Sequence, residues 1–269
     1  MGGLSHFTRL YAPAYMVQTI YNVGWVAVDR APPEHVPSFT HNAERTMTTR
    51  TQLIEAFHQQ THHQGWFVAD EDFPADGQID GEFYPHLENI FFGLGGVSPD
   101  KVRYLILGQD PYPDADKEIP QATGLAFDVD IRCLPSIGNS LPQSLSEIMR
   151  NLRADKMEAQ DAVLAYRQWV TRNHILMLNS ALTYKPNVKN TYRRVWENFL
   201  ISIIRQARYR SRYVKFVAWG SDAKKLLSKA LNDGTPFAFA GHPKDRNGSK
   251  SFREFWTHGL GLELRKLAV

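Results

Sequence analysis

Four short apolar segments of the chain are each followed, or ended, by a polar residue that can take part in chemistry. In chain order these polar residues are Asp110, Asn179, Ser221 and His242. A carboxylate can orient water or stabilise positive charge, and an imidazole can donate a hydrogen bond to an oxygen that becomes negative. A carboxamide offers one donor and one acceptor to the polar edge of a planar ligand. The set is therefore a candidate for one functional site.

The segment that carries the carboxylate is stiffened by two prolines. Asp110 precedes Pro111, and Tyr112 precedes Pro113. A residue before proline is biased toward extended backbone. Such a loop suits a site that must hold a carboxylate at a fixed distance from a reacting carbon. An ordinary strand-ending turn, with the aspartate hydrogen-bonded to backbone, remains the alternative interpretation of this segment.

The elements that would position these residues follow from the apolar patterning. Apolar runs predict strands, and the longer amphipathic segments between them predict helices. Alternation of the two predicts a three-layer α/β/α sandwich with a central, mainly parallel, four-stranded sheet, in which ligands bind beyond the carboxyl ends of the strands. The predicted strands are 102–107, 174–178, 213–219 and 237–240, and the predicted helices include 144–152, 161–172, 191–207 and 222–231.

Two predicted helices begin with residues that could contact an anion. Ser144 and Glu147 have the spacing of a capping box, and Ser221 opens the helix that begins near Asp222. Free amides at a helix start, together with a serine hydroxyl, can bind a phosphate, although simple helix caps explain the same pattern. No dinucleotide or P-loop fingerprint is present in the sequence.

Composition excludes several classes of protein. The 269 residues are 43% hydrophobic with a net charge of +3, as in ordinary globular chains, and no apolar run is long enough for a membrane helix. A single cysteine, Cys133, allows neither an internal disulfide nor an iron–sulfur cluster. We expect a cytoplasmic protein, associated with the nucleoid if bacterial. The histidines at 58, 62 and 63 lack a metal-binding motif, so we expect no metal or other cofactor.

The chain divides into two parts on its local composition. Residues 1–45 hold three prolines within 32–37 and predict an N-terminal extension. Residues 46–269 predict a single α/β/α domain.

Several strings resemble the ung-type (family 1) uracil-DNA glycosylases. The most specific is Leu105–Tyr112, which reads LILGQDPY, and the resemblance spans residues 84 to 258. Further strings that match are Gly124–Phe127, Leu178–Asn179 and His242–Pro243. The resemblance implies an enzyme that flips uracil out of DNA and hydrolyses its N-glycosidic bond, with uracil-containing DNA, single- or double-stranded, as partner and abasic DNA as product. It also implies a monomer that needs no cofactor.

The resemblance carries roles onto individual residues. Asp110 would activate water and stabilise the cationic sugar, and His242 would stabilise the departing uracil anion. Tyr112 would exclude the methyl group of thymine, and Phe127 would stack on the base. The remaining uracil contacts would be Gln109 and Asn179, and the DNA contacts would be Ser144, Ser221, Pro243, Lys244 and Arg246.

Three features depart from the family pattern. Pro113 stands where the motif ordinarily ends in histidine, the stretch from Asp110 to Phe127 is longer, and Arg246 stands at the position of the family's wedging leucine. These departures keep open a uracil- or abasic-DNA binding protein with weak or slow-turnover catalysis. An unrelated α/β enzyme for nucleotides or phosphates is the third alternative.

Overall fold

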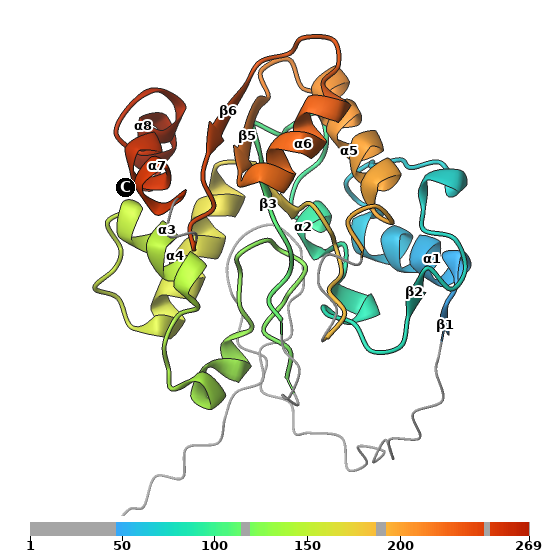
Figure 1. Ribbon diagram of the computed structural model, residues 1–269, viewed down its shortest axis with the longest axis horizontal. Helices are drawn as coiled ribbons and strands as arrows, with labels where there is room; N and C mark the ends of the chain where they lie inside the picture. Colours follow the sequence, from blue (N-terminus) through green and yellow to red (C-terminus); the bar gives the residue numbers. More distant parts are fainter. Residues whose placement is uncertain (1–46, 114–118, 187–191, 245–247, 269) are drawn as a thin grey trace, which may run out of the picture. The chain divides into compact units, whose positions relative to one another are not determined.

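A four-stranded parallel sheet forms the centre of the protein (Figure 1). The computed structural model describes residues 47–113, 119–186, 192–244 and 248–268. The predicted N-terminal extension, 1–45, lies outside these residues. The sheet has the order β4-β3-β5-β6, and its strands are β3 (Tyr104–Gly108), β4 (Ile175–Asn179), β5 (Lys215–Trp219) and β6 (Phe237–Ala240).

The strands are apolar because both faces of the sheet are covered. Successive side chains of a strand point to opposite faces, so Leu105 and Leu107 lie in one hydrophobic core while Tyr104 and Ile106 lie in another. Every residue of β3 and β4 is buried. Continuous apolar runs of this kind are typical of strands in parallel sheets.

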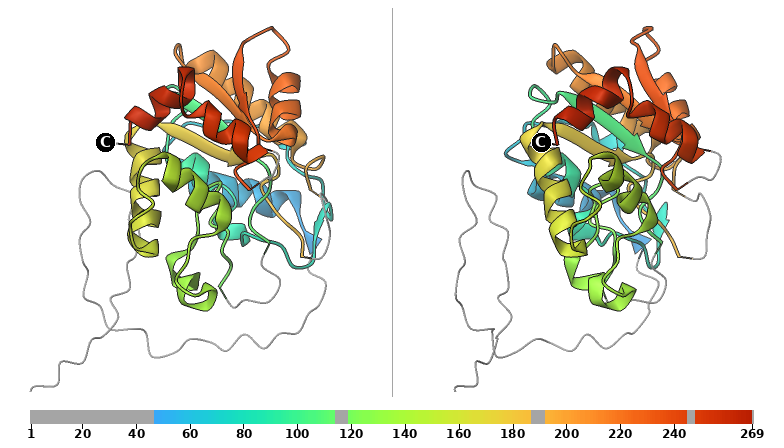
Figure 2. Two further views of the ribbon diagram at one scale, coloured as in Figure 1. Left: turned by 60° about the vertical axis from the view of Figure 1, so that its left-hand side comes forward. Right: turned by 90° about the vertical axis from the view of Figure 1, so that its left-hand side faces the viewer.

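The helices lie in two layers on either side of the sheet (Figures 1 and 2), which confirms the predicted α/β/α sandwich. One layer holds α1 (Arg50–Thr61), α2 (Phe92–Gly95), α5 (Glu197–Arg210) and α6 (Ser221–Ala230). The other holds α3 (Gln143–Asn151), α4 (Ala159–Arg172), α7 (Gly248–Phe255) and α8 (Gly259–Lys266). No helix of the described residues has the length and apolar character needed to cross a membrane.

Short elements complete the described part of the chain. Three 3₁₀ helices connect larger elements, and two short strands pair antiparallel outside the main sheet. The 3₁₀ helices are Asp70–Asp72, Leu87–Asn89 and Ile131–Ile137, and the short strands are β1 (Met47–Thr48) and β2 (Ile79–Asp80).

Two local predictions are wrong. Helix α5 begins at Glu197 rather than Thr191, and Ser144 does not cap α3. Pro142 precedes α3 without a side-chain cap, and Ser144 is already inside the helix and buried. Glu147 is instead paired with Arg253, whose Nε lies 2.6 Å from its Oε1. The capping-box spacing was misleading because α3 already begins at Gln143, so Ser144 cannot be its N-cap, and the Glu147 carboxylate pairs with Arg150 and Arg253.

The strand order places a ligand site at the end of β3. From β3 the chain continues to β4 on one side of it and then to β5 on the other. In open α/β sheets the crevice beyond the carboxyl ends of the strands, at such a change of direction, is where ligands bind. Gly108 and Asn179 are paired at this end of β3 and β4.

Candidate active site

A cavity of about 640 Å³ opens at the carboxyl ends of β3 and β4. It collects most of the site residues expected from the sequence. Ser221 and Pro243 do not line the cavity, and Arg246 lies outside the described residues. The expected residues that do line it are Gln109, Asp110, Tyr112, Phe127, Ser144, Asn179, His242 and Lys244.

The floor of the cavity is formed where Gly108, Phe127 and Asn179 converge. A Cβ on Gly108 would lie 2.7 Å from Oδ1 of Asn179 and 2.7 Å from Cζ of Phe127. Asn179 is buried, and no donor in the described part of the chain reaches its Oδ1. A buried carbonyl oxygen without a donor is costly, so this atom is a candidate for a ligand N–H.

Phe127 is held in an unusual backbone conformation. Its φ is 64°, in the left-handed region that a bulky residue rarely adopts. Its ring lies 5.9 Å from the imidazole of His242 and 5.6 Å from the indole of Trp219, measured between ring centroids. The conformation therefore presents an aromatic ring beside the imidazole, on the wall of the cavity.

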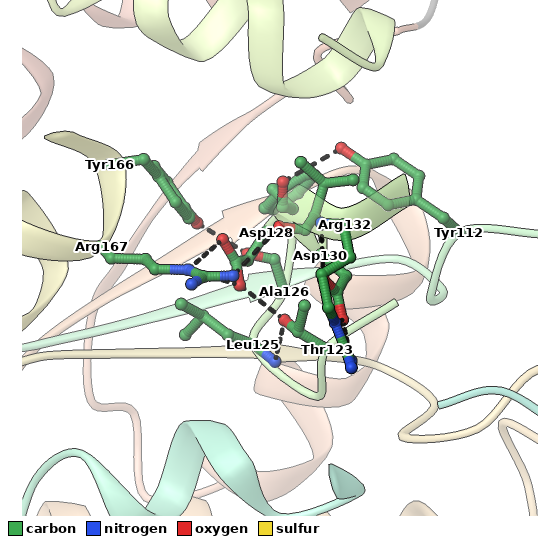
Figure 3. Close-up of polar contacts among 11 residues, drawn as sticks. Tyr112, Thr123, Leu125, Ala126, Asp128, Asp130, Arg132, Tyr166 and Arg167 are labelled. Atoms are coloured by element: carbon green, nitrogen blue, oxygen red, sulfur yellow. Dashed lines mark hydrogen bonds and ion pairs between the residues drawn. The ribbon is translucent and has the colours of Figure 1, made fainter. Parts of the chain in front are cut away.

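A buried ion pair fixes the segment that carries this ring (Figure 3). Arg167 Nε lies 3.0 Å from Oδ1 of Asp128, and Thr123 Oγ1 donates to Oδ2 of Asp128 at 2.7 Å. Burial raises the pKa of Asp128, while Arg167 and Thr123 counteract this effect. The Tyr166 hydroxyl donates to the carbonyl of Ala126 at 2.6 Å. The side chains of Thr123, Asp128, Tyr166 and Arg167 thus hold the segment that carries Phe127 in place.

Tyr112 links the Asp110 loop to the same turn. Its hydroxyl donates to the carbonyl of Phe127 at 3.1 Å (Figure 3). Burial, together with the nearby charge of Asp128, raises the pKa of the Tyr112 phenol above its ordinary value. The phenol is therefore neutral and acts as a fixed wall of the cavity beside Phe127.

Asp110 is bound by an arginine that motif analysis did not identify. Arg193 Nε donates to Oδ1 of Asp110 at 2.9 Å, and its Nη2 pairs with Oδ2. Its third nitrogen, Nη1, donates to Oδ2 of Asp222 at 2.6 Å. Burial alone would lower the pKa of Arg193, but the two carboxylates raise it. In the sequence, Arg193 is distinguished only by its place in the basic stretch 185–215, which holds nine lysine or arginine residues and one acidic residue.

Hydrogen bonds from the loop after β4 to the end of β3 and the loop that follows it fix the position of Asp110. Ser180 Oγ donates to the carbonyl of Gly108 at 2.7 Å, and the amide of Ala181 donates to the carbonyl of Gln109 at 3.3 Å. The loop after β4 therefore supports the loop after β3. Such support preorganises a carboxylate before a substrate arrives.

His242 is oriented by the backbone that follows it. The amide of Lys244 donates to Nδ1 of His242 at 3.2 Å. A ring nitrogen that accepts a hydrogen bond carries no proton, so the neutral imidazole has its proton on Nε2. His242 can therefore donate a hydrogen bond from Nε2.

The predicted anion contacts lie at two helix starts. Ser221 is the first residue of α6 and follows Gly220, whose φ is 108°. Ser144 is the second residue of α3 and lines the cavity. Only the first of these has the exposed helix start that a phosphate contact uses.

Described residues of the basic stretch 185–215 lie at opposite ends of the sheet. Arg193 lies beside Asp110 at the carboxyl end of β3, whereas Lys215 opens β5 at the opposite end of the sheet. A second cavity, of about 410 Å³, lies at that opposite end and contains none of the predicted site residues. Among the residues described here, no cluster of three or more histidine, cysteine or acidic side chains could hold a metal ion.

Comparison with known proteins gives a consistent result, although no family model matches the chain. The uracil-DNA glycosylase of Chlamydia abortus is 34% identical over 173 residues, which is 63% of this chain and 70% of that protein. The uracil-DNA glycosylase of Agathobacter rectalis is 30% identical over 183 residues, covering 67% of this chain and 76% of that protein.

A solved structure agrees with these relatives. The crystal structure of a mimivirus UNG variant in complex with UGI matches with a TM-score of 0.50 and 29% identity, covering 60% of this chain and 58% of that one. The similarity extends over more than two thirds of the bacterial relatives' length and accompanies a cavity lined by the motif residues. The chain thus belongs to the uracil-DNA glycosylase family, and the enzyme class predicted from its motifs, a hydrolase of N-glycosyl bonds, is confirmed.

Proposed function

We propose that the cavity takes a uracil base flipped out of DNA and that Asp110 and His242 carry out the hydrolysis of its N-glycosidic bond. The observation that carries this proposal is the buried Oδ1 of Asn179, which has no donor in the described part of the protein. Uracil presents a ring N–H next to a carbonyl oxygen. The Asn179 carboxamide can accept from the first and donate to the second.

The reaction uses groups that face the cavity. As the bond between C1′ and N1 breaks, its electron pair leaves with uracil, and the sugar becomes positively charged. His242 donates a hydrogen bond from Nε2 to a uracil oxygen and stabilises the anion. The carboxylate of Asp110 stabilises the cationic sugar and accepts the proton of the water that adds to C1′. The products are uracil and an abasic site.

Selection of the base rests on the shape of the cavity. Phe127 stacks on the flipped base, and Gln109 forms part of the surrounding wall. Tyr112 fills the place of a 5-methyl group, so thymine is rejected by steric conflict. The rigid hydrogen bond of Tyr112 to the Phe127 carbonyl supports this role.

The DNA strand would be held at the mouth of the cavity and beside it. We propose DNA contacts, on either single- or double-stranded DNA, for Ser221 at the exposed start of α6 and for Pro243, Lys244 and Arg246; Ser144, which is buried and lines the cavity, would contact only the part of the strand that enters it. We also propose that the protein acts as a monomer, in the cytoplasmic compartment that holds the DNA.

A binding protein with weak catalysis is the second candidate. The observation that favours it is the pairing of both Asp110 oxygens with Arg193, which reduces the negative charge available to the sugar. Rapid excision under enzyme excess would exclude this candidate.

The proposal is tested through Asn179. Asn179→Ala removes the donor and the acceptor, and loss of two hydrogen bonds is expected to lower single-turnover excision by about 10- to 100-fold. Asn232→Ala is the control, because Asn232 is exposed. Equal excision by wild type and Asn179→Ala would contradict the assigned base contact.

A further inference from the structure

We propose that Arg193 is a positioning residue for the catalytic carboxylate: its guanidinium fixes the orientation of Asp110, and Asp222 in turn fixes the guanidinium. This inference rests on the role proposed above for Asp110. It gives a function to a residue that lies 83 positions from Asp110 in the chain.

The geometry is that of a fork on a carboxylate. Two nitrogens of Arg193 reach the two oxygens of Asp110, and the third reaches Asp222. The side chains are 17%, 24% and 22% exposed for Arg193, Asp110 and Asp222, so solvent competes weakly for these bonds. A planar, two-point contact restricts rotation of a carboxylate far more than a single hydrogen bond does.

Arg193 reaches Asp110 from outside the cavity. Asp110 lines the cavity, whereas Arg193 and Asp222 do not. Each carboxylate oxygen has two lone-pair sites, and the fork occupies one of them on each oxygen. The sites that remain can accept a hydrogen bond from a water molecule in the cavity. Arg193 is therefore placed to act through Asp110 rather than on the substrate.

The charge of the cluster is compatible with a cationic sugar nearby. A lone arginine beside Asp110 would oppose positive charge on the sugar. Asp222 offsets this effect, because the two carboxylates outnumber the partly buried guanidinium; the Lys225 ammonium, 3.8 Å from Oδ1 of Asp222, is 80% exposed, so solvent screens its charge. The arrangement keeps a negative site while it fixes the carboxylate.

The backbone that carries Arg193 is itself anchored on both sides. The Tyr192 hydroxyl accepts from the amide of Asp80 at 3.2 Å. The buried Trp196 indole donates to Thr183 Oγ1 at 2.8 Å. A guanidinium carried on a fixed backbone can transmit its position to Asp110.

Single-turnover excision of uracil from an oligonucleotide tests the inference. We compare Arg193→Gln, Arg193→Lys and Asp222→Asn, each in the wild-type and the Asp110→Asn background. Arg194→Gln is the matched control, because Arg194 is the exposed neighbour of Arg193. Affinity for uracil DNA and the thermal midpoint are measured for every variant.

A positioning role predicts strong coupling between the two sites. Arg193→Gln is expected to lower the excision rate about 10- to 100-fold, since a misplaced catalytic group costs up to about 10²-fold. Arg193→Lys keeps the positive charge but cannot make the two-point contact, so its excision rate should lie between those of wild type and Arg193→Gln. In the Asp110→Asn background the same substitutions should have no further effect, and affinity for uracil DNA should be unchanged.

Other results would overturn the inference. An equal loss in both backgrounds, a loss confined to DNA affinity, or unchanged excision by Arg193→Gln each contradict positioning through Asp110. If Arg193→Gln lowers the thermal midpoint strongly, the inference is tested with Arg193→Lys and Asp222→Asn instead. Each must then slow excision in the wild-type background and have no further effect in the Asp110→Asn background. Failure of the proposed function itself is distinct, because then wild type would bind uracil DNA without excising uracil, or Asp110→Asn alone would excise it at the wild-type rate.

Discussion

Gly108 and Asn179 are partners across β3 and β4, and the carboxamide oxygen of Asn179 occupies space that a side chain on residue 108 would need. The ring of Phe127 approaches the same point to 2.7 Å from the position of a Cβ. Glycine at the end of β3 thus lets the amide and the aromatic ring meet at the floor of the cavity. A side chain added at residue 108 should therefore weaken uracil binding more than it weakens folding.

Gly108→Ala is expected to lower affinity for uracil DNA and single-turnover excision at least tenfold. The added methyl group must displace the Asn179 carboxamide or the Phe127 ring, with a stability cost of about 1 to 3 kcal/mol typical of overpacking. Gly96→Ala is the control, since its Cβ would meet its nearest neighbour at an ordinary 3.7 Å. Wild-type excision by a folded Gly108→Ala protein would show that the convergence is unimportant.

Tyr112→Ala should release thymine or 5-methylated bases from DNA, because it empties the space proposed for the methyl group. Tyr112→Phe keeps the ring and should still reject thymine. The raised pKa of Tyr112 favours the neutral phenol, so rejection by wild type should not change with pH up to its ordinary pKa of about 10. Chromatography of released bases measures both effects. The steric role is wrong if folded Tyr112→Ala protein releases no thymine.

His242→Ala should slow the chemical step about 10²- to 10³-fold, as loss of one preorganised donor to a developing anion does. The loss should shrink for 5-fluorouracil, whose anion is a better leaving group and needs less stabilisation. The measurement is single-turnover excision of both bases by wild type and variant. An equal loss for the two bases would argue that His242 does not act on the leaving group.

Arg167→Met should destabilise the domain by about 3 kcal/mol, because it leaves the fully buried carboxylate of Asp128 without its partner. Arg132→Met removes a similar pair with Asp130, but its arginine is 70% exposed, so the cost should be at most about 1 kcal/mol (Figure 3). Urea unfolding measures both variants. Equal costs for the two pairs would contradict the importance given to the buried one.

The sheet and the strand-end residues could be predicted because their causes are local. A strand covered on both faces must be apolar throughout, as Ile175–Asn179 shows up to its last residue. Parallel strands bring their carboxyl ends to one edge, so residues such as Asp110 and His242 share a site whatever connects them.

The supports of the site could not be predicted, because each depends on contacts between distant segments. The Arg193 fork reaches across 83 positions, and Arg167 reaches Asp128 across 39. Neither pair has a local pattern that distinguishes it from other charges. The start of α5 was misjudged for a related reason, since Arg193 and Trp196 form tertiary contacts in the turn before the helix.

The central claim, that Asp110 drives hydrolysis of the uracil glycosidic bond, is tested most directly by uracil release under enzyme excess. Wild type and Asp110→Asn are compared on single- and double-stranded uracil oligonucleotides in the presence of a chelator, with Asp130→Asn as control. The account predicts metal-independent excision by wild type and by the control, and a loss of about 10²- to 10⁴-fold in Asp110→Asn with uracil-DNA binding retained. Tight binding without excision by wild type, or undiminished excision by Asp110→Asn, would contradict it.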